Sequence, residues 1–203
     1  SGKASIHSEK EMQEILKNLK GKSLQVKDIK KNIRTKKSPL PFTTSTLQQE
    51  AARKLNFATG KTMRIAQQLY EGVDVKGRGS VGLITYLRTD STRISDEANQ
   101  SAFEYISSKY GKQYAKESVQ KAKTNKKIQD AHEAIRPTDV ELNPIVLKEQ
   151  LTRDQFRLYQ LIYNRFLASR MEAAQYESTT IKLDCEGYEF SATSTKMIFD
   201  GFM

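Results

Sequence analysis

Apolar and polar residues recur at two different spacings along the first forty residues of the chain. Between residues 9 and 19 apolar side chains return every three or four positions after Ser8, which is typical of a helix with a serine cap. Residues 24–29 alternate apolar and polar positions, as in a half-exposed strand. Two prolines then interrupt regular structure, which predicts a domain boundary near residues 38–42.

Two short helices are predicted after this boundary. Ser45 and Gln48 have the spacing of a capping box, and the helix that they open is predicted to end at Gly60. A second helix spans about residues 61–71, and a glycine-containing hairpin is predicted over residues 73–86. The residues of the second helix predicted to face inward are Met63, Ala66, Leu69 and Tyr70. Two helices followed by a hairpin favour a winged-helix-like unit.

The rest of the chain predicts two longer helices and a terminal hairpin. Ser95 is placed to cap a helix over residues 96–110, and a capping-box pair opens the longest helix, about residues 153–173. We interpret the aromatic stripe of this helix as core. Residues 179–192 alternate around a turn, and this hairpin could pair with the N-terminal strand. The pattern therefore predicts a β-containing module split around a helical insertion.

The composition of the chain predicts a polyanionic partner. The 203 residues suffice for one or at most two domains, and their 37% hydrophobic content can supply a core. Lys and Arg number 34 against 24 acidic residues, and the resulting net charge of +10 points to nucleic acid or anionic lipid. No apolar run approaches the ~20 residues of a membrane span, so we expect a soluble protein without a membrane partner. The chain ends suggest a piece of a larger protein.

Cysteine content and local charge narrow the chemistry further. Cys185 stands alone, which excludes an internal disulfide framework or a multi-cysteine zinc module and suits a reducing cytoplasm. Residues 20–37 contain eight basic residues and one acid. They form either a solvated strand edge guarded by lysines or a face that contacts phosphates. A second lysine-rich stretch covers residues 112–127.

The sharpest chemical signal lies in residues 83–93. In an extended strand Tyr86 and Arg88 share one face, because side chains alternate. A permanent cation beside a phenol favours the phenolate and offsets charge on a phosphodiester, so the pair suits a tyrosine that attacks phosphate. The same pair is also common as plain surface packing. The hydroxyls of residues 89–92 could donate to phosphates or simply form a turn.

A second constellation occupies residues 130–138. His132 and Arg136 would share a helical face, but Pro137 disfavours a helix at Arg136, so a turn at a helix end is predicted. A zinc-protease motif is excluded, because it requires a second histidine at position 136. His132 is a candidate for proton transfer or phosphate contact, with a hydrogen-bonded structural histidine as the alternative.

Three motifs taken together resemble the type IA DNA topoisomerases. They are PFTTSTLQQEA at residues 41–51, GLITYLRTDST at residues 82–92 and HEAIRPT at residues 132–138, in the order of the family. Leu87 stands where methionine is common and where the topoisomerase III branch tends to carry proline, so the resemblance favours the bacterial topoisomerase I branch. It covers nearly the whole chain.

The resemblance implies an architecture. The fold would be α+β, with a mostly helical, winged-helix-like domain that carries the active-site tyrosine inserted into a split, β-rich arch domain. The arch would comprise residues 1–42 and 166–203, and the helical domain residues 43–165.

The resemblance also implies a mechanism. Tyr86 would attack single-stranded DNA and form a 5′-phosphotyrosyl bond, after which another strand passes the gap before religation. Arg88 would hold the scissile phosphate, and His132 would stand near the scissile site. Weaker candidates for DNA contact are Thr89, Ser91 and Arg136. The full-length enzyme would be cytoplasmic, associated with the bacterial nucleoid, and would act on single-stranded and negatively supercoiled DNA.

The family's metal site is expected outside this chain. In this family Mg²⁺ is held by acidic residues of a Toprim domain, and much single-strand binding lies in another domain; we find neither here, and we assign no metal ligand. The chain alone is therefore expected to be inactive. The alternative hypothesis is a non-catalytic winged-helix DNA-binding module, in which residues 61–71 read the major groove.

Overall fold

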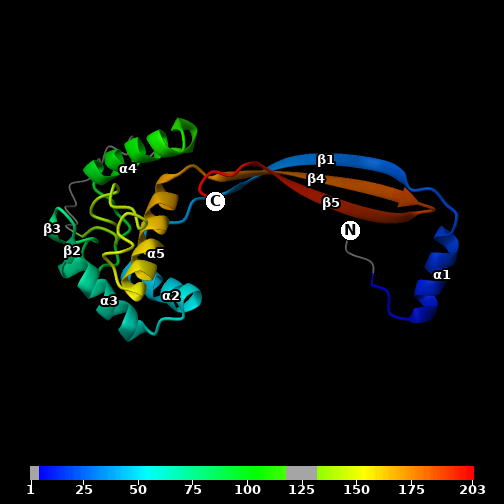
Figure 1. The fold of residues 1–203 in the computed structure, drawn as a ribbon. Helices are drawn as coiled ribbons and strands as arrows, with labels where there is room; N and C mark the ends of the chain where they lie inside the picture. Colours follow the sequence, from blue (N-terminus) through cyan, green and yellow to red (C-terminus); the bar gives the residue numbers. More distant parts are fainter. Residues whose placement is uncertain (1–4, 118–131) are drawn as a thin grey trace. The chain divides into compact units, whose positions relative to one another are not determined.

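The computed structural model describes residues 5–117 and 132–203, which form two compact units (Figure 1). Unit 1 comprises Ser1–Lys36 and Gln175–Phe199, and unit 2 comprises Lys37–Ala174 and Asp200–Met203. Along the chain, the units meet after residues 36 and 174, whereas the expected bounds were residues 42 and 166. Residue 166 cannot be a boundary, because it lies inside a continuous helix. Most of the lysine-rich stretch at residues 112–127 lies outside the described residues.

Unit 1 is a helix and a three-stranded sheet. Its elements are α1 (Glu9–Leu19), β1 (Gln25–Lys36), β4 (Ala174–Cys185, whose first residue belongs to unit 2) and β5 (Tyr188–Phe199). The Ser8 hydroxyl accepts a hydrogen bond from the backbone of Glu11, which confirms the predicted cap. The strand order is β1-β4-β5, with β4 and β5 antiparallel (Figure 1), so the predicted pairing of the tail hairpin with the N-terminal strand is confirmed.

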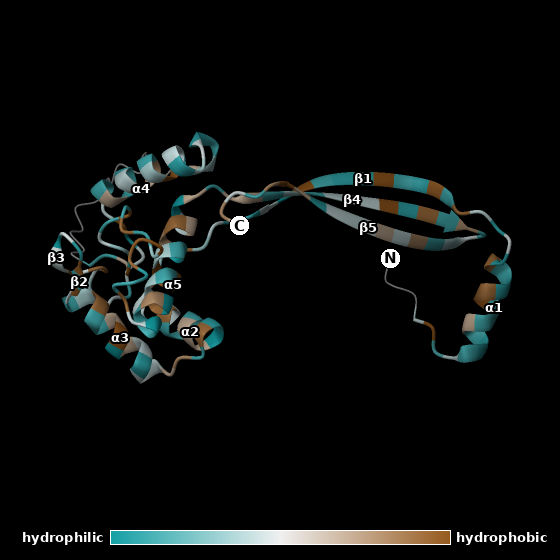
Figure 2. Ribbon diagram, in the orientation of Figure 1, coloured by the Kyte–Doolittle hydropathy of each residue, from teal (hydrophilic) through white to brown (hydrophobic). Residues whose placement is uncertain are grey.

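The strand β1 extends to Lys36, well beyond the predicted end at residue 29. Every residue of β1 except Asp28 is exposed, so its lysines reach water on both sides and carry no desolvation cost. Hydrophobic residues stand singly between polar ones along the strand (Figure 2). Residues 25–36 of the cationic stretch therefore form a solvent-exposed edge strand, with ion pairs such as Lys27 to Glu189 at 3.5 Å. This exposure fits both predicted alternatives, a solvated edge and a face that contacts phosphates.

Unit 2 is largely helical. Its helices are α2 (Thr44–Leu55), α3 (Thr59–Glu71), α4 (Asp96–Lys109), the 3₁₀ turn η1 (Lys112–Tyr114) and α5 (Arg153–Arg170). The caps predicted for α4 and α5 are confirmed, since Ser95 accepts from Ala98 and Thr152 forms a capping box with Gln155.

The predicted start and end of α2 are wrong. Thr43 caps the helix, because its extended backbone lets its side chain accept from the backbone of Thr46, whereas Ser45 already lies inside the helix. The helix ends at Leu55, where Asn56 takes a left-handed conformation with φ 57°. Asparagine supplies the stop that the sequence interpretation gave to Gly60, and Gly60 belongs to α3.

The hairpin after α3 is shorter than predicted. Its strands are β2 (Val73–Val75) and β3 (Gly79–Val81), paired antiparallel. The chain beyond Val81 leaves regular structure, because its hydrogen bonds go to α3 and to residues 134–138 instead of to β2. Tyr86 therefore does not lie in a hairpin strand.

All residues of the hydrophobic core cluster lie in unit 2. The aromatic stripe of α5 belongs to it, as predicted: Tyr159 and Tyr163 are buried and donate to the carbonyls of Leu142 (2.7 Å) and Val140 (2.6 Å). Burial raises the pKa of both phenols. Tyr70, predicted to face inward, is instead 39% exposed. Within the described ranges no helix has the length and apolar character needed to cross a membrane.

Candidate active site

Tyr86 lies in an irregular segment that follows the β2–β3 hairpin. Its side chain is 46% exposed, whereas the next residue, Leu87, is 2% exposed and anchors the segment in the core. The Tyr86 ring meets Tyr70 of α3 edge-on, with centroids 5.5 Å apart and planes at 64°. Buried and exposed residues thus alternate around Tyr86 although the segment is not a β-strand. The Tyr86 phenol faces solvent.

The Tyr86 segment runs beside the chain around Arg136. Ile84 and Pro137 form an antiparallel bridge. The Thr85 hydroxyl donates to the carbonyl of Ala134 at 2.7 Å and accepts from the backbone N–H of Arg136 at 3.0 Å. The backbone N–H of Thr85 donates to the carbonyl of Arg136 at 2.9 Å. One threonine therefore ties the segments of two distant motifs together.

A second threonine holds the other side of the segment. The Thr44 hydroxyl, at the start of α2, donates to the carbonyl of Leu87 at 2.7 Å and accepts from the backbone N–H of Thr89 at 2.9 Å. The Thr44 backbone N–H donates to the carbonyl of Thr89, also at 2.9 Å. The chain on both sides of Tyr86 is thereby fixed to other elements, and the first of the three motifs acts as its support.

A pocket of about 250 Å³ opens where these segments meet. The residues that line it are Tyr70, Thr85, Tyr86, Thr89, His132 and Glu133. His132 is exposed, as is Tyr86. The pocket thus combines two phenols, an imidazole and a carboxylate from α3 and from two of the motifs.

Glu133, which lines this pocket, forms an ion pair with Arg136. The Glu133 carboxylate accepts from Arg136 Nη2 at 2.7 Å and from the backbone N–H of Ser95, and the two paired side chains are only 18% and 13% exposed. Burial raises the pKa of Glu133, but the charge and hydrogen bond of Arg136 outweigh it, so the pKa lies below its ordinary value. Glu133 is therefore an anion that anchors Arg136.

The predicted site residues fall into two groups. Tyr86, Thr89 and His132 line one pocket. The other three predicted residues, Arg88, Ser91 and Arg136, do not line it. Arg88 is exposed, and no ion pair joins it to any residue in ranges 5–117 and 132–203. The Ser91 hydroxyl accepts from the backbone of Arg93 at 3.1 Å. Arg136 is engaged by Glu133 and by the carbonyl of Pro137.

Three residues that line the pocket were not predicted from the sequence: Tyr70, Thr85 and Glu133. Glu133 lies in the third motif, but its pairing with Arg136 became visible only in the fold. Tyr70 was assigned to the core, although its position directly after the inward Leu69 turns it by about 100° on the helix, toward the edge of the apolar face. Thr85 carries no pattern that distinguishes it from a strand threonine, because its role depends on contacts with residues 134 and 136 that are remote in sequence.

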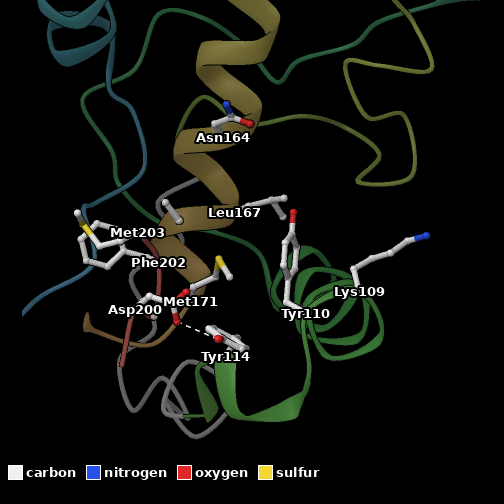
Figure 3. Close-up of a pocket in the computed structure, with 11 residues that line it drawn as sticks. Lys109, Tyr110, Tyr114, Asn164, Leu167, Met171, Asp200, Phe202 and Met203 are labelled. Carbon is white, nitrogen blue, oxygen red and sulfur yellow. Dashed lines mark hydrogen bonds between the residues drawn. The ribbon is translucent and has the colours of Figure 1, made fainter. Parts of the chain in front are cut away.

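A second, larger hollow lies elsewhere in unit 2 and contains none of these residues. It measures about 610 Å³ between the end of α4, the side of α5 and the segment after β5 (Figure 3). Tyr114 points toward Asp200 and donates to it at 2.8 Å, and this bond raises the pKa of Tyr114. The contact holds residues 200–203 against the helical unit.

Similarity to known proteins assigns the family. A family model described as DNA topoisomerase matches residues 1–203. The chain belongs to this family. It is similar to topoisomerase I of Thermotoga maritima, a bacterial type IA enzyme, in a structure of the full-length protein. The identity is 41% and the TM-score 0.82 over 100% of this chain. The resemblance found in the three motifs is thus confirmed.

This topoisomerase chain corresponds to only part of its relative. It covers 32% of the Thermotoga maritima chain. In the described part of the topoisomerase chain, no three His, Cys, Asp or Glu side chains gather closely enough to hold a metal ion.

Proposed function

We propose that this chain carries the nucleophile of a type IA DNA topoisomerase and that Tyr86 is this nucleophile. The full-length protein would relax negatively supercoiled DNA by cutting one strand, passing another strand through the gap and religating. The observation that carries the proposal is the exposed Tyr86 phenol in a pocket shared with His132, held from both sides by Thr44 and Thr85. A rigidly presented nucleophile reacts faster than a mobile one.

The proposed reaction is a transesterification. The Tyr86 oxygen bonds to phosphorus while the bond from phosphorus to the 3′-oxygen breaks. The phenol proton passes to a base, and the released 3′-oxygen takes up a proton. The product is a 5′-phosphotyrosine and a free 3′-hydroxyl. Because one ester replaces another, the reverse reaction restores the DNA without a high-energy cofactor.

Arg88 and His132 have proposed roles around the scissile phosphate. Arg88 is an exposed guanidinium two residues from Tyr86, and it would hold phosphate oxygens and offset the charge that builds on them. His132 shares the pocket and would transfer a proton or contact phosphate. Thr89 and Ser91 would support DNA contact. We propose a supporting role for Arg136, because its guanidinium already pairs with Glu133.

We further propose that Mg²⁺ and much of the single-strand binding belong to Toprim and DNA-binding domains outside these residues. The 203-residue chain alone is then expected neither to cleave nor to relax DNA. Relaxation of supercoiled plasmid by the purified chain with Mg²⁺ would contradict this. The full-length enzyme would act in the cytoplasm.

Substitution of Tyr86 tests the assignment in the full-length protein. Tyr86→Phe keeps the ring and removes only the attacking oxygen, so covalent capture of a single-stranded oligonucleotide should vanish. Arg88→Ala should slow cleavage sharply and keep detectable capture. Tyr110→Phe, an exposed tyrosine at the end of α4, is the matched control and should react normally. A normal yield of covalent complex from Tyr86→Phe would refute the proposal.

The order of α2, α3, β2 and β3 favours one alternative, a non-catalytic winged-helix module. In it the exposed side of α3, with Arg64 and Gln68, would read duplex DNA. A gel-shift titration separates the two functions. Sequence preference on duplex DNA supports the module, whereas salt-sensitive preference for single strands supports the topoisomerase.

A further inference from the structure

Tyr70 stands in the Tyr86 pocket without an assigned task. Its ring is 39% exposed and lines the pocket together with Tyr86 and His132. We propose that Tyr70 is a stacking platform for one base of single-stranded DNA, next to the phosphate that Tyr86 attacks. This inference rests on the proposed function and adds a binding subsite to it.

The backbone holds Tyr70 firmly. It lies in the last turn of α3, directly after Leu69, whose side chain is fully buried and whose carbonyl accepts from the backbone N–H of Leu83 at 2.7 Å. Gly82 packs so closely that an added Cβ would approach the carbonyl oxygen of Tyr70 to 2.7 Å. The Tyr70 backbone therefore keeps a fixed place relative to the segment that carries Tyr86, and the edge-on contact with Tyr86 restricts the ring. A platform that is already ordered loses little entropy when it binds.

A substantial part of Tyr70, 39% of its surface, remains exposed beside its contact with Tyr86. The two rings meet edge-on at 5.5 Å, a geometry that covers only part of each ring. The Tyr70 hydroxyl makes no hydrogen bond to any residue in the described ranges. A ring that served only to orient Tyr86 would gain stability by burying the rest of its surface. The exposed remainder, opening into a pocket of about 250 Å³, suits a flat aromatic ligand.

Single-stranded DNA supplies such a ligand. Its unstacked bases offer apolar faces, and stacking on an aromatic side chain tolerates every base because each has a π-face. A base on Tyr70 would leave the adjoining phosphate near the Tyr86 oxygen. It would also exclude water from one side of the pocket. Tyr70 would thus fix the register of the strand at the cleavage site.

Binding measurements in the full-length protein test this subsite. The proteins carry Tyr86→Phe to prevent covalent capture, and labelled oligonucleotides carry an abasic site at each position in turn. Tyr70→Leu keeps an apolar side chain but removes the ring, and should weaken binding to intact DNA roughly 5- to 150-fold. Tyr70→Phe should bind within about twofold of the parent. Tyr110→Leu, another exposed tyrosine at a helix end, is the control and should bind normally.

The abasic series identifies the partner base. At one position beside the cleavage site, the abasic substitution should weaken DNA binding by the parent protein as much as Tyr70→Leu weakens binding to intact DNA. The abasic substitution and Tyr70→Leu together should then reduce affinity no more than either change alone. Losses that simply add at every position would overturn the inference. Normal binding by Tyr70→Leu with slower capture in the Tyr86 background would show instead that Tyr70 only orients the nucleophile.

A measurement on unsubstituted Tyr70 covers the case in which Tyr70→Leu misfolds. With 2-aminopurine placed at each position, fluorescence should be quenched at the base that stacks on Tyr70, and unchanged fluorescence near the cleavage site would overturn the inference. If the proposed function itself is wrong, the result differs: the unsubstituted enzyme forms no covalent adduct on Tyr86, and substitution of Tyr70 does not matter.

Discussion

Glu133 illustrates how one carboxylate stabilises the pocket. Its pKa lies below 4.5, since Arg136 and the Ser95 N–H outweigh the effect of burial. A carboxylate with a lowered folded pKa contributes stability above its unfolded pKa, and this contribution is lost as the pH falls through the folded value. Arg136 is the main partner, so its guanidinium is left buried and less well paired when Glu133 is neutral.

The variant Glu133→Gln should therefore lower the free energy of unfolding at pH 7 by about 1–3 kcal/mol, the worth of hydrogen bonds to a charged group. The difference from the parent should narrow as the pH falls below about 4.5. Urea denaturation of the parent and the variant, at pH 7 and again below about pH 4.5, measures this difference in the free energy of unfolding. Glu141→Gln, an exposed carboxylate without an ion pair in the described residues, should have little effect at either pH. A gap that widens in acid would contradict this explanation.

At the scale of elements, most helices could be predicted because local signals suffice for them. The caps at Ser8, Ser95 and Thr152 determine where α1, α4 and α5 begin. The signals failed where a neighbouring residue competed, as at Thr43, and where an exposed strand continued through lysines, as in β1. Neither outcome follows from spacing alone, because the cap depends on the extended backbone of Thr43 and the length of β1 depends on its exposed place at the sheet edge.

The conformation of the segment around Tyr86 depends on hydrogen bonds to distant parts of the chain. Substitution of Thr85 tests whether these bonds stabilise the fold. Thr85→Val keeps the shape but leaves the carbonyl of Ala134 and the N–H of Arg136 without this partner. We expect a loss of about 1–3 kcal/mol in the free energy of unfolding and faster amide exchange at Arg136. Thr85→Ser retains the hydroxyl and should keep most of the stability. Equal losses in both variants would mean that the hydroxyl is not what ties the segments.

At the scale of the whole chain, the two units differ in how much they bury. The hydrophobic core cluster lies in unit 2, and among the described residues of unit 1 only Ser178 and Cys185 are buried. Amide protection follows buried packing. We expect slow hydrogen exchange in α3 and α5 and much faster exchange in β1 and β5, measured by mass spectrometry on the 203-residue chain. Equal protection in the two units would contradict this difference.

The three motifs predicted the family from the sequence, whereas Tyr70 and Thr85 emerged only from the fold, because their partners lie far away in the chain. The central claim is that Tyr86 becomes covalently linked to DNA. Its most direct test is mass spectrometry of the full-length enzyme after reaction with a single-stranded suicide substrate, with the modified residue mapped by peptide sequencing. We predict a 5′-phosphoryl oligonucleotide on Tyr86 and on no other tyrosine. An adduct on another residue, with Tyr86 unmodified, would contradict the account.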